Sequence, residues 1–201
     1  MSSKTEIANM AISHLGMGKE IANLDTEQSK EASACRRFYD VAKKAVLLDY
    51  NWTFATKQAT LNLVEENPND DWLYSYRYPV DCLTIRRVLS GLRKDTLSSK
   101  IPFKIAKDSA GKLIYSDQED ASVEYTEDVD DPSYFSTPFT IALSFKLASM
   151  IAPRVTSGDP YKIKQEMLAQ YTLELNNAKK ADMNEETQDL IPDSESILIR
   201  G

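Results

Sequence analysis

The spacing of apolar residues changes twice along the chain and predicts two helical regions on either side of a β region. Residues 3–48 and 137–181 carry apolar positions every three to four residues, the period of a helix with one buried face. From about residue 57 to 131, apolar and polar residues alternate, as they do in β-strands. We therefore expect an α+β fold, with an antiparallel β-sheet region inserted into a four-helix bundle-like core.

The chain has 201 residues, the length of one domain that carries a sizeable insertion. A chain of this length buries enough surface to form a core without disulfide bonds or metals. The expected regions are the N-terminal bundle helices (1–56), the β insertion (57–132), the C-terminal bundle helices (133–186) and an extended tail (187–201).

Capping signals predict where the first two helices begin. Ser3 with Glu6 forms a capping box before the first apolar stripe. Asp25 with Gln28 forms a second such box, and the helix that follows it is expected to run to about Leu48.

Proline marks the expected helices of the C-terminal half. Thr137 is the expected cap of the third helix, with Pro138 at its first position. Pro153 is expected to end or kink this helix early, because proline lacks the backbone N–H that the helix interior needs. Asp159 followed by Pro160 repeats the same cap and predicts the start of the fourth helix.

Alternation predicts the strands of the β insertion. The stretch WLYSYRYP places four aromatic residues on one side of a strand: Trp72, Tyr74, Tyr76 and Tyr78. Pro79 ends this strand, and DCLTIRRVL predicts the next one. The stretches IPFKIAK, KLIYS and ASVEYTE predict a three-stranded meander, joined by turns at DSAG and DQED.

The formal net charge is −7, which argues against a DNA-coating protein because phosphate binding requires clustered Lys and Arg. The charge is divided into blocks. Residues 86–112 hold eight basic and two acidic residues, whereas residues 117–132 hold eight acidic residues and no basic one. Such blocks are usually solvated faces, but they also suit contacts between copies. The candidates for such contacts are Arg86, Arg87, Arg93, Lys94, Glu119 and Asp120.

The residues that carry most enzyme chemistry are scarce. His14 is the single histidine, so a metal site with two histidines is not available. Cys35 and Cys82 show no metal-ligand spacing and are expected as buried thiols, with a single bridge between them as the alternative. The acidic pairs are expected in solvated turns: Glu65–Glu66, Asp70–Asp71 and Asp130–Asp131. We therefore expect no enzyme activity and no cofactor.

Three motifs follow one another in the first half: AISHLGMGKEIANLD, SKEASACRRFYDVAKKAVLLDYNWTFATKQATL and WLYSYRYPVDCLTIRRV. This series closely resembles the tail tubular protein A family, the head-to-tail adaptors of short-tailed phages. The match covers about residues 8–90 and departs from the family pattern at Ser13 and His14. The family's W-x-F-A and Y-x-x-P-x-D-C-L motifs fall on Trp52, Phe54, Ala55, Tyr76, Pro79, Asp81, Cys82 and Leu83.

The resemblance implies a structural virion protein of the phage neck, made in the host cytoplasm and without a membrane partner. Such adaptors form a ring of twelve copies beneath the portal protein and offer a platform for the tail nozzle. Double-stranded DNA passes through the ring without specific binding. Trp52 and Phe54 are then expected to pack where the helical bundle meets the sheet.

The C-terminal stretch TQDLIPDSESILIRG has no helical period, and Pro192 forbids a regular helix there. Because similar adaptors use their C-terminal ends, we expect this tail to dock on the portal. The candidate docking residues are Leu190, Ile191, Ile197, Leu198, Ile199 and Arg200. Ile197 and Ile199 would fill pockets, while Leu198 and Arg200 would face the other way. The alternative is a tail that folds back on its own bundle.

Two other functions fit the sequence. The first is a small cytoplasmic α+β enzyme or ligand-binding protein, whose unrecognised site uses scattered Asp, Tyr and Arg residues. The second is a virion-assembly chaperone that is absent from the finished particle. Neither alternative has a motif of its own in this chain.

Overall fold

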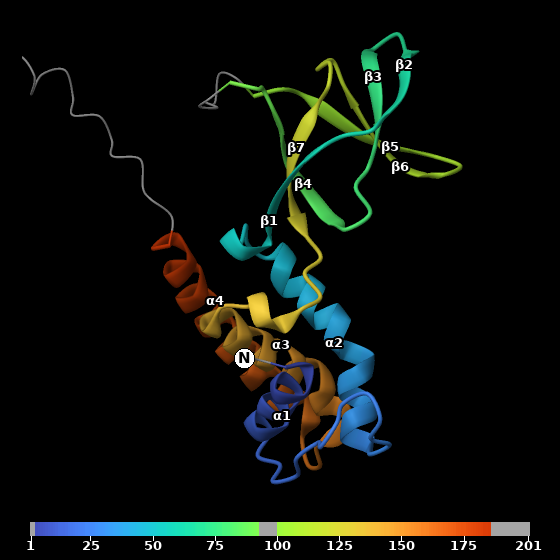
Figure 1. Ribbon diagram of the computed structural model, residues 1–201. Helices are drawn as coiled ribbons and strands as arrows, with labels where there is room; N and C mark the ends of the chain where they lie inside the picture. The colour runs from blue at the N-terminus through green and yellow to red at the C-terminus, as the bar shows by residue number, and fades with distance from the viewer. Residues whose placement is uncertain (1–2, 93–99, 186–201) are drawn as a thin grey trace, which may run out of the picture.

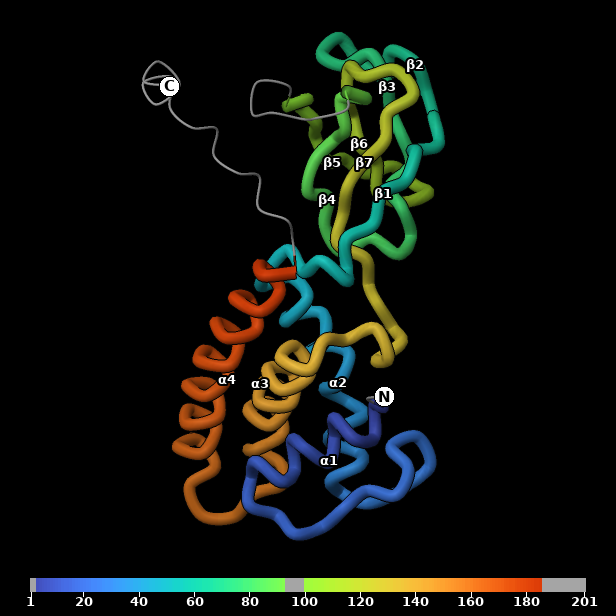
Figure 2. Tube along the Cα trace, turned by 60° about the vertical axis from the view of Figure 1, so that its left-hand side comes forward, coloured from blue at the N-terminus to red at the C-terminus, as the bar shows by residue number. Residues whose placement is uncertain are grey.

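The computed structural model describes residues 3–92 and 100–185. Four helices lie at one end of the molecule and seven antiparallel strands at the other (Figure 1). The predicted α+β class is confirmed. Figure 2 shows that the chain crosses from the helical end to the strands and returns, so the β region is an insertion between α2 and α3.

The helix α3 lies at the centre of the bundle and packs against each of the other three helices. This place follows from its composition, because its buried residues include four large side chains: Phe139, Leu143, Leu147 and Ile151. The four helices are α1 (Lys4–His14), α2 (Lys30–Leu48), α3 (Thr137–Val155) and α4 (Pro160–Met183).

The expected start of α1 is confirmed, and that of α2 is wrong. Both hydrogen bonds of the capping box at Ser3 are present. The helix α2 begins after Ser29, whose hydroxyl accepts a hydrogen bond from the N–H of Ala32. Asp25 instead lies in a turn where the Asn23 side chain accepts its backbone N–H. This local bond competes with the helix and delays its start.

The helix α3 is capped by Ser136, so the expectation of Thr137 as its cap is wrong by one residue. Pro153 lies in the last turn, and the helix ends at Val155. The cap of α4 is confirmed, because the Asp159 carboxylate accepts the N–H of Lys162.

The strands form two antiparallel sheets. The first has the order β1-β7-β4, and the second has the order β2-β3-β6-β5. The strands are β1 (Thr56–Thr60), β2 (Leu63–Asn69), β3 (Trp72–Arg77), β4 (Cys82–Leu89), β5 (Phe103–Asp108), β6 (Gly111–Ser116) and β7 (Ser122–Glu127).

The predicted meander of the last three strands is wrong. Strands β5 and β6 form the expected hairpin, but β6 pairs next with β3. Strand β7 leaves this sheet and lies between β1 and β4. Ala121 marks the change of sheet, because it is buried and its carbonyl accepts the N–H of Leu61. Alternation specifies which face of a strand is buried, but it does not specify which strand lies beside it.

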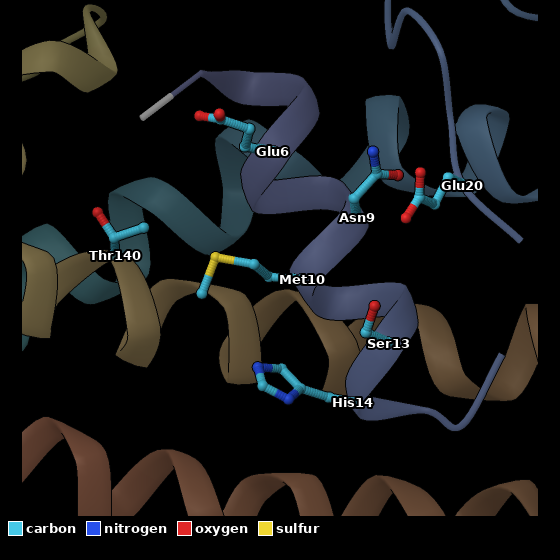
Figure 3. Close-up of a pocket in the computed structure, with 7 residues that line it drawn as sticks. All are labelled: Glu6, Asn9, Met10, Ser13, His14, Glu20 and Thr140. Atoms are coloured by element: carbon cyan, nitrogen blue, oxygen red, sulfur yellow. The ribbon is translucent and has the colours of Figure 1, made fainter. Parts of the chain in front are cut away.

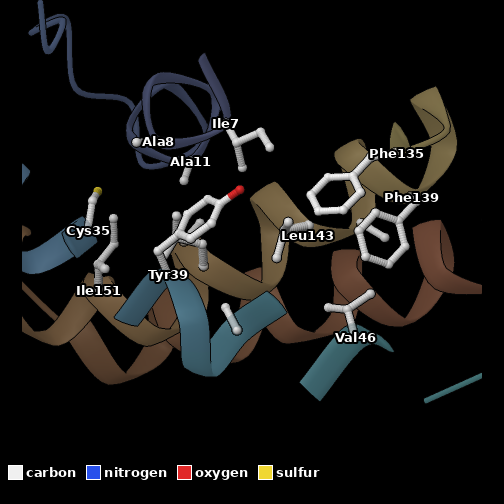
Figure 4. Close-up of a cluster of buried hydrophobic side chains, with 14 of the residues drawn as sticks. Ile7, Ala8, Ala11, Cys35, Tyr39, Val46, Phe135, Phe139, Leu143 and Ile151 are labelled. Carbon is white, nitrogen blue, oxygen red and sulfur yellow. The ribbon is translucent and has the colours of Figure 1, made fainter. Parts of the chain in front are cut away.

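The molecule has two apolar cores. The helical core combines residues of all four helices, and Figure 4 shows α1, α2 and α3 converging on it. The second core lies within the β region and consists of Leu61, Tyr76, Val88, Ile114, Ala121, Val123 and Tyr125. Because the two cores are separate, the position of one relative to the other depends on the chain segments at their junction.

Trp52 closes the helical core at that junction, as the sequence predicts. Its side chain is fully buried, and its indole N–H donates to the carbonyl of Val46 at 2.8 Å. The ring packs edge-on against Phe139 at a centroid distance of 5.0 Å. Phe54 also packs against this core and makes an edge-on contact with Phe139.

We expect Trp52→Ala to lower the free energy of unfolding by roughly 3–5 kcal/mol, because it leaves a large cavity in a packed core. Urea denaturation followed by circular dichroism would measure the change. The control is Tyr161→Ala on α4, which removes an aromatic ring that is 70% exposed and should change stability by less than about 0.5 kcal/mol. An unchanged unfolding midpoint for Trp52→Ala would contradict the structural role.

Candidate functional site

The two family motifs meet where the helices give way to the sheets. The W-x-F-A motif follows α2 and leads through a 3-10 helix (Thr53–Ala55) into β1. The D-C-L end of the second motif begins β4, and Leu83 packs against the helical core, as Phe54 does. Lys57 on β1 joins the two motifs, because its ammonium lies 2.5 Å from Asp81 Oδ2. Segments about 25 residues apart in sequence therefore form one junction.

Arg86 strengthens the same junction from β4. Its guanidinium donates hydrogen bonds to the carbonyl of Trp52 at 3.2 Å, to Thr56 Oγ1 at 2.6 Å and to Thr126 Oγ1 at 3.1 Å. These bonds connect the end of the helical core to three strands of the first sheet. A guanidinium suits this position because its donors point in fixed directions.

Asp81 is held as a carboxylate by its neighbours. Lys57 Nζ lies between Asp81 and Glu127, and the hydroxyl of Tyr125 donates to Asp81 Oδ1 at 3.0 Å. Burial would raise the pKa of Asp81, but the hydrogen bonds from Lys57 and Tyr125 lower it below its usual value. Burial and the bond to Asp81 raise the pKa of Tyr125 to about 12. Asp81 thus stays ionised beside the Lys57 ammonium, and Tyr125 keeps its hydroxyl proton near neutral pH.

The rest of the second motif lies within the β region. Tyr76 is buried in the β core, and its hydroxyl donates to the carbonyl of Gln118 at 2.6 Å. The N–H of Cys82 donates to the carbonyl of Pro79 and closes the turn between β3 and β4. Val80 at the tip of this turn is fully exposed.

The two thiols are free, so no bridge joins them. Cys35 is buried in the helical core, and burial raises its pKa to about 12. Cys82 is half-buried, and burial raises its pKa as well. Neither thiol has the lowered pKa of a reactive cysteine.

Of the candidate contact residues, some already bond to other residues of the same chain and others are exposed. Arg86 belongs to the junction, and Arg87 forms an ion pair with Glu124 at 2.9 Å. Glu119 and Asp120 are exposed in the turn between β6 and β7. The other contact candidates and the whole docking tail lie outside the described residues: Arg93, Lys94, Leu190, Ile191, Ile197, Leu198, Ile199 and Arg200.

A shallow acidic depression of about 510 Å³ lies at the junction. It is lined by Phe54, Val129, Tyr134 and the carboxylates of Asp81, Glu127, Asp128, Asp130 and Asp131. Lys43 on α2 lies against two of these carboxylates, at 2.8 Å from Asp128 and 2.5 Å from Asp130.

Lys43 is the buried charged residue of this depression that the sequence analysis missed. Its side chain is only 1% exposed. Burial alone would lower its pKa, but the hydrogen bonds to Asp128 and Asp130 raise it, so the amine stays charged. The helical period contained the signal, because Lys43 lies four residues after Tyr39 and three before Val46, both of which are buried.

The acidic pairs correct another expectation. Asp70 and Asp71 form an exposed turn, as expected. Asp130 and Asp131 are exposed and lie outside the helices and strands, as expected, although Asp130 also pairs with Lys43. Glu65 and Glu66 lie on strand β2, so the expectation of a turn is wrong for this pair. Acidic residues are tolerated on β2 because its side chains are exposed on both faces.

His14 borders a second shallow pocket, of about 540 Å³, along α1 (Figure 3). Its ring stacks on Phe145 at 3.7 Å, and Nε2 lies 2.9 Å from Ser144 Oγ. Because the Ser144 hydroxyl donates to the carbonyl of Ile141, its oxygen is the acceptor of the hydrogen bond with the Nε2–H group. Burial lowers the pKa of His14. These contacts fix α1 on α3 and give the histidine a structural role.

Within residues 3–92 and 100–185, no group of three or more His, Cys, Asp or Glu side chains is placed to hold a metal ion. No helix in the same ranges is long and apolar enough to cross a membrane.

The burial of Lys43 predicts an asymmetric response to mutation. The double substitution Asp128→Asn with Asp130→Asn leaves a buried charge without a carboxylate and should cost about 3–5 kcal/mol of stability. Lys43→Met leaves two carboxylates that water reaches, with side-chain exposures of 21% and 79%, and should cost less than about 2 kcal/mol. Thermal and urea unfolding of the variants would measure both values, and equal costs would contradict the assigned asymmetry.

The same ion pair predicts the pH dependence of stability. The bond from Lys43 lowers the pKa of Asp130, so its contribution is present above the unfolded-state pKa of about 3.9. That contribution is lost as the pH falls through the lower folded-state pKa. The contribution of Lys43, whose pKa is raised, is lost only as the pH rises through that raised value. When the pH is lowered below about 4, we expect the free energy of unfolding to fall less for Lys43→Met than for the wild type. Unfolding measured at stepwise pH would show the difference.

Comparison with models of known protein families finds no match for this chain, and comparison with curated proteins finds none. The resemblance to the adaptor family therefore rests on the three sequence stretches of residues 8–90 alone.

Proposed function

We propose that the protein is a head-to-tail adaptor of a short-tailed phage. In this function it is a structural protein of the virion neck, where a ring of copies joins the portal to the tail nozzle and extends the DNA channel. The observation that carries the proposal is the meeting of the two family motifs at the junction, where Lys57, Asp81 and Arg86 connect them. Residues of both motifs thus take part in one junction, while Tyr76 belongs to the β core.

The two-ended shape supports this function. An adaptor contacts a different partner at each of its two ends, and neighbouring copies at its sides. This chain presents helices at one end and strands at the other (Figure 1). The buried junction keeps the two ends in a defined relation, because Trp52 and Arg86 tie them through both packing and hydrogen bonds. A net charge of −7 favours passage of DNA, since like charge prevents capture of phosphate groups.

Electron microscopy of the protein mixed with purified portal tests the proposal directly. A ring of copies on the portal is the expected result. A protein that binds a small molecule tightly and ignores the portal would support the enzyme or ligand-binding alternative. Mass spectrometry of purified virions separates the remaining alternative, because an assembly chaperone would be absent from them.

We expect the ring to form on the portal and not in free solution. Twelve copies at −7 each carry −84 formal charges together, which opposes closure at low salt. Native mass spectrometry at low ionic strength should find monomers or small assemblies without portal and rings with it. Stable rings of the isolated protein under these conditions would show that the portal is not required.

Deletion of residues 194–201 should abolish attachment to DNA-filled heads and leave the melting temperature nearly unchanged. The proposed reason is that the tail adds an extended strand to the portal, with alternate side chains in pockets. Ile197→Asp with Ile199→Asp should then weaken attachment more than the control Leu198→Asp with Arg200→Gln, which changes the net charge by the same −2. Co-sedimentation with heads measures attachment, and normal binding of the truncated protein would exclude the docking role.

A further inference from the structure

The two outer strands of the four-stranded sheet carry opposite charges. Strand β2 forms one edge and carries Glu65 and Glu66, whereas β5 forms the other edge and carries Lys104 and Lys107. All four side chains are exposed. None of them forms an ion pair within the described part of the chain.

The acidic edge extends beyond β2 itself. The turn from β2 to β3 contributes Asp70 and Asp71, and the turn from β6 to β7 lies beside it, since Asp117 accepts the N–H of Leu73 at 3.0 Å. Glu119 and Asp120 follow in the same turn. Three aliphatic side chains are also exposed here, Leu63, Val64 and Leu73, at 44–50%. We call this surface the acidic edge.

The basic edge has the same combination with the opposite sign. Lys107 lies across from Lys112 on β6, and Ile105 is 45% exposed between Lys104 and Lys107. The one acid on β5, Asp108, is already paired with Arg77 through two hydrogen bonds of 3.0 Å. The remaining charge of this edge is therefore positive.

The two edges do not meet within one molecule. Three strand spacings separate β2 from β5 in the sheet order, which corresponds to roughly 14 Å. A surface that exposes both charges and aliphatic side chains is complementary to one that also exposes aliphatic side chains but carries the opposite charge. We propose that a second copy of this chain is that surface, so that the basic edge of one copy contacts the acidic edge of the next.

Strand direction fits this arrangement. Each neighbouring pair in the sheet is antiparallel, so β2 and β5 run in opposite directions. If neighbouring copies are related by rotation about an axis parallel to the strands, each strand keeps its direction from copy to copy. Strand β5 of one copy then lies antiparallel to β2 of the next. Register shifts and Pro68 interrupt β2, so the contact is made by side chains and does not extend the backbone ladder.

The contact is heterologous, because each copy uses a different surface on each side. Repetition of such a contact gives a closed ring or an open chain. The two sheet edges would thus form the contact between neighbouring copies in the ring. Closure of this contact into a ring rests on the proposed function. The pairing itself needs no portal and is tested without one.

Charge exchange between the two edges tests the pairing. One variant carries Glu65→Lys with Glu66→Lys, which reverses the charge of β2, and the other carries Lys104→Glu with Lys107→Glu, which reverses the charge of these two positions on β5. Sedimentation velocity at up to about 1 mM protein and 0.15 M salt is suitable, because repulsion beyond about 8 Å is screened there. We expect weak association of the wild type, at least about tenfold weaker association of each variant alone, and recovery in the equimolar mixture.

Matched controls change the net charge equally at the helical end: Asp25→Lys with Glu166→Lys, and Lys30→Glu with Lys162→Glu. They should associate as the wild type does. A monomeric wild type, or a mixture without recovery, would overturn the inference. If the mixture recovers but the protein ignores the portal, the pairing stands and the proposed function fails. If rings form on the portal but the mixture does not recover association, the proposed function stands and the pairing of the two edges fails.

Discussion

Burial of Trp52 at the end of the helical core is the constraint on which the rest of the structure depends. The indole fills the space against Phe139, and its N–H satisfies a carbonyl at the end of α2. The Trp52 carbonyl in turn accepts from Arg86 on β4. One residue thus connects core packing to the orientation of the first sheet. Without it, the relative position of the two cores would depend on the remaining junction contacts, such as Leu83 on the helical core and Lys57 with Asp81.

Local signals predicted the helices well because caps and periodicity act over a few residues. The capping box at Ser3 and the cap at Asp159 are correct. The box predicted at Asp25 is wrong, because the Asn23 side chain accepts the backbone N–H of Asp25 in a turn. The sheets were predicted less well. The transfer of β7 to the other sheet depends on a contact between Ala121 and Leu61, which lie far apart in sequence. No period within either segment contains that information.

The candidate site shows the same division between local and distant information. The motifs around Trp52 and Asp81 were visible in sequence, but their meeting through Lys57 depends on strand pairing. Charge counting marked Arg86 and Arg87 as contact residues, yet both are used inside the chain. A charge becomes available to a partner only where the fold gives it no neighbour of opposite sign. Within the basic block 86–112, that condition selects Lys104 and Lys107 on β5 rather than Arg86 and Arg87 on β4.

Placing opposite charges on opposite edges has a consequence for assembly. A contact built from exposed charges and few aliphatic side chains is weak in one pair, because water and salt compete for it. A ring repeats the contact at every position, and a template that holds copies side by side raises their effective concentration. Weak edges therefore fit a protein whose net charge opposes association in free solution. They allow copies to stay apart until a partner gathers them, and the junction around Trp52 then gives every copy the same shape.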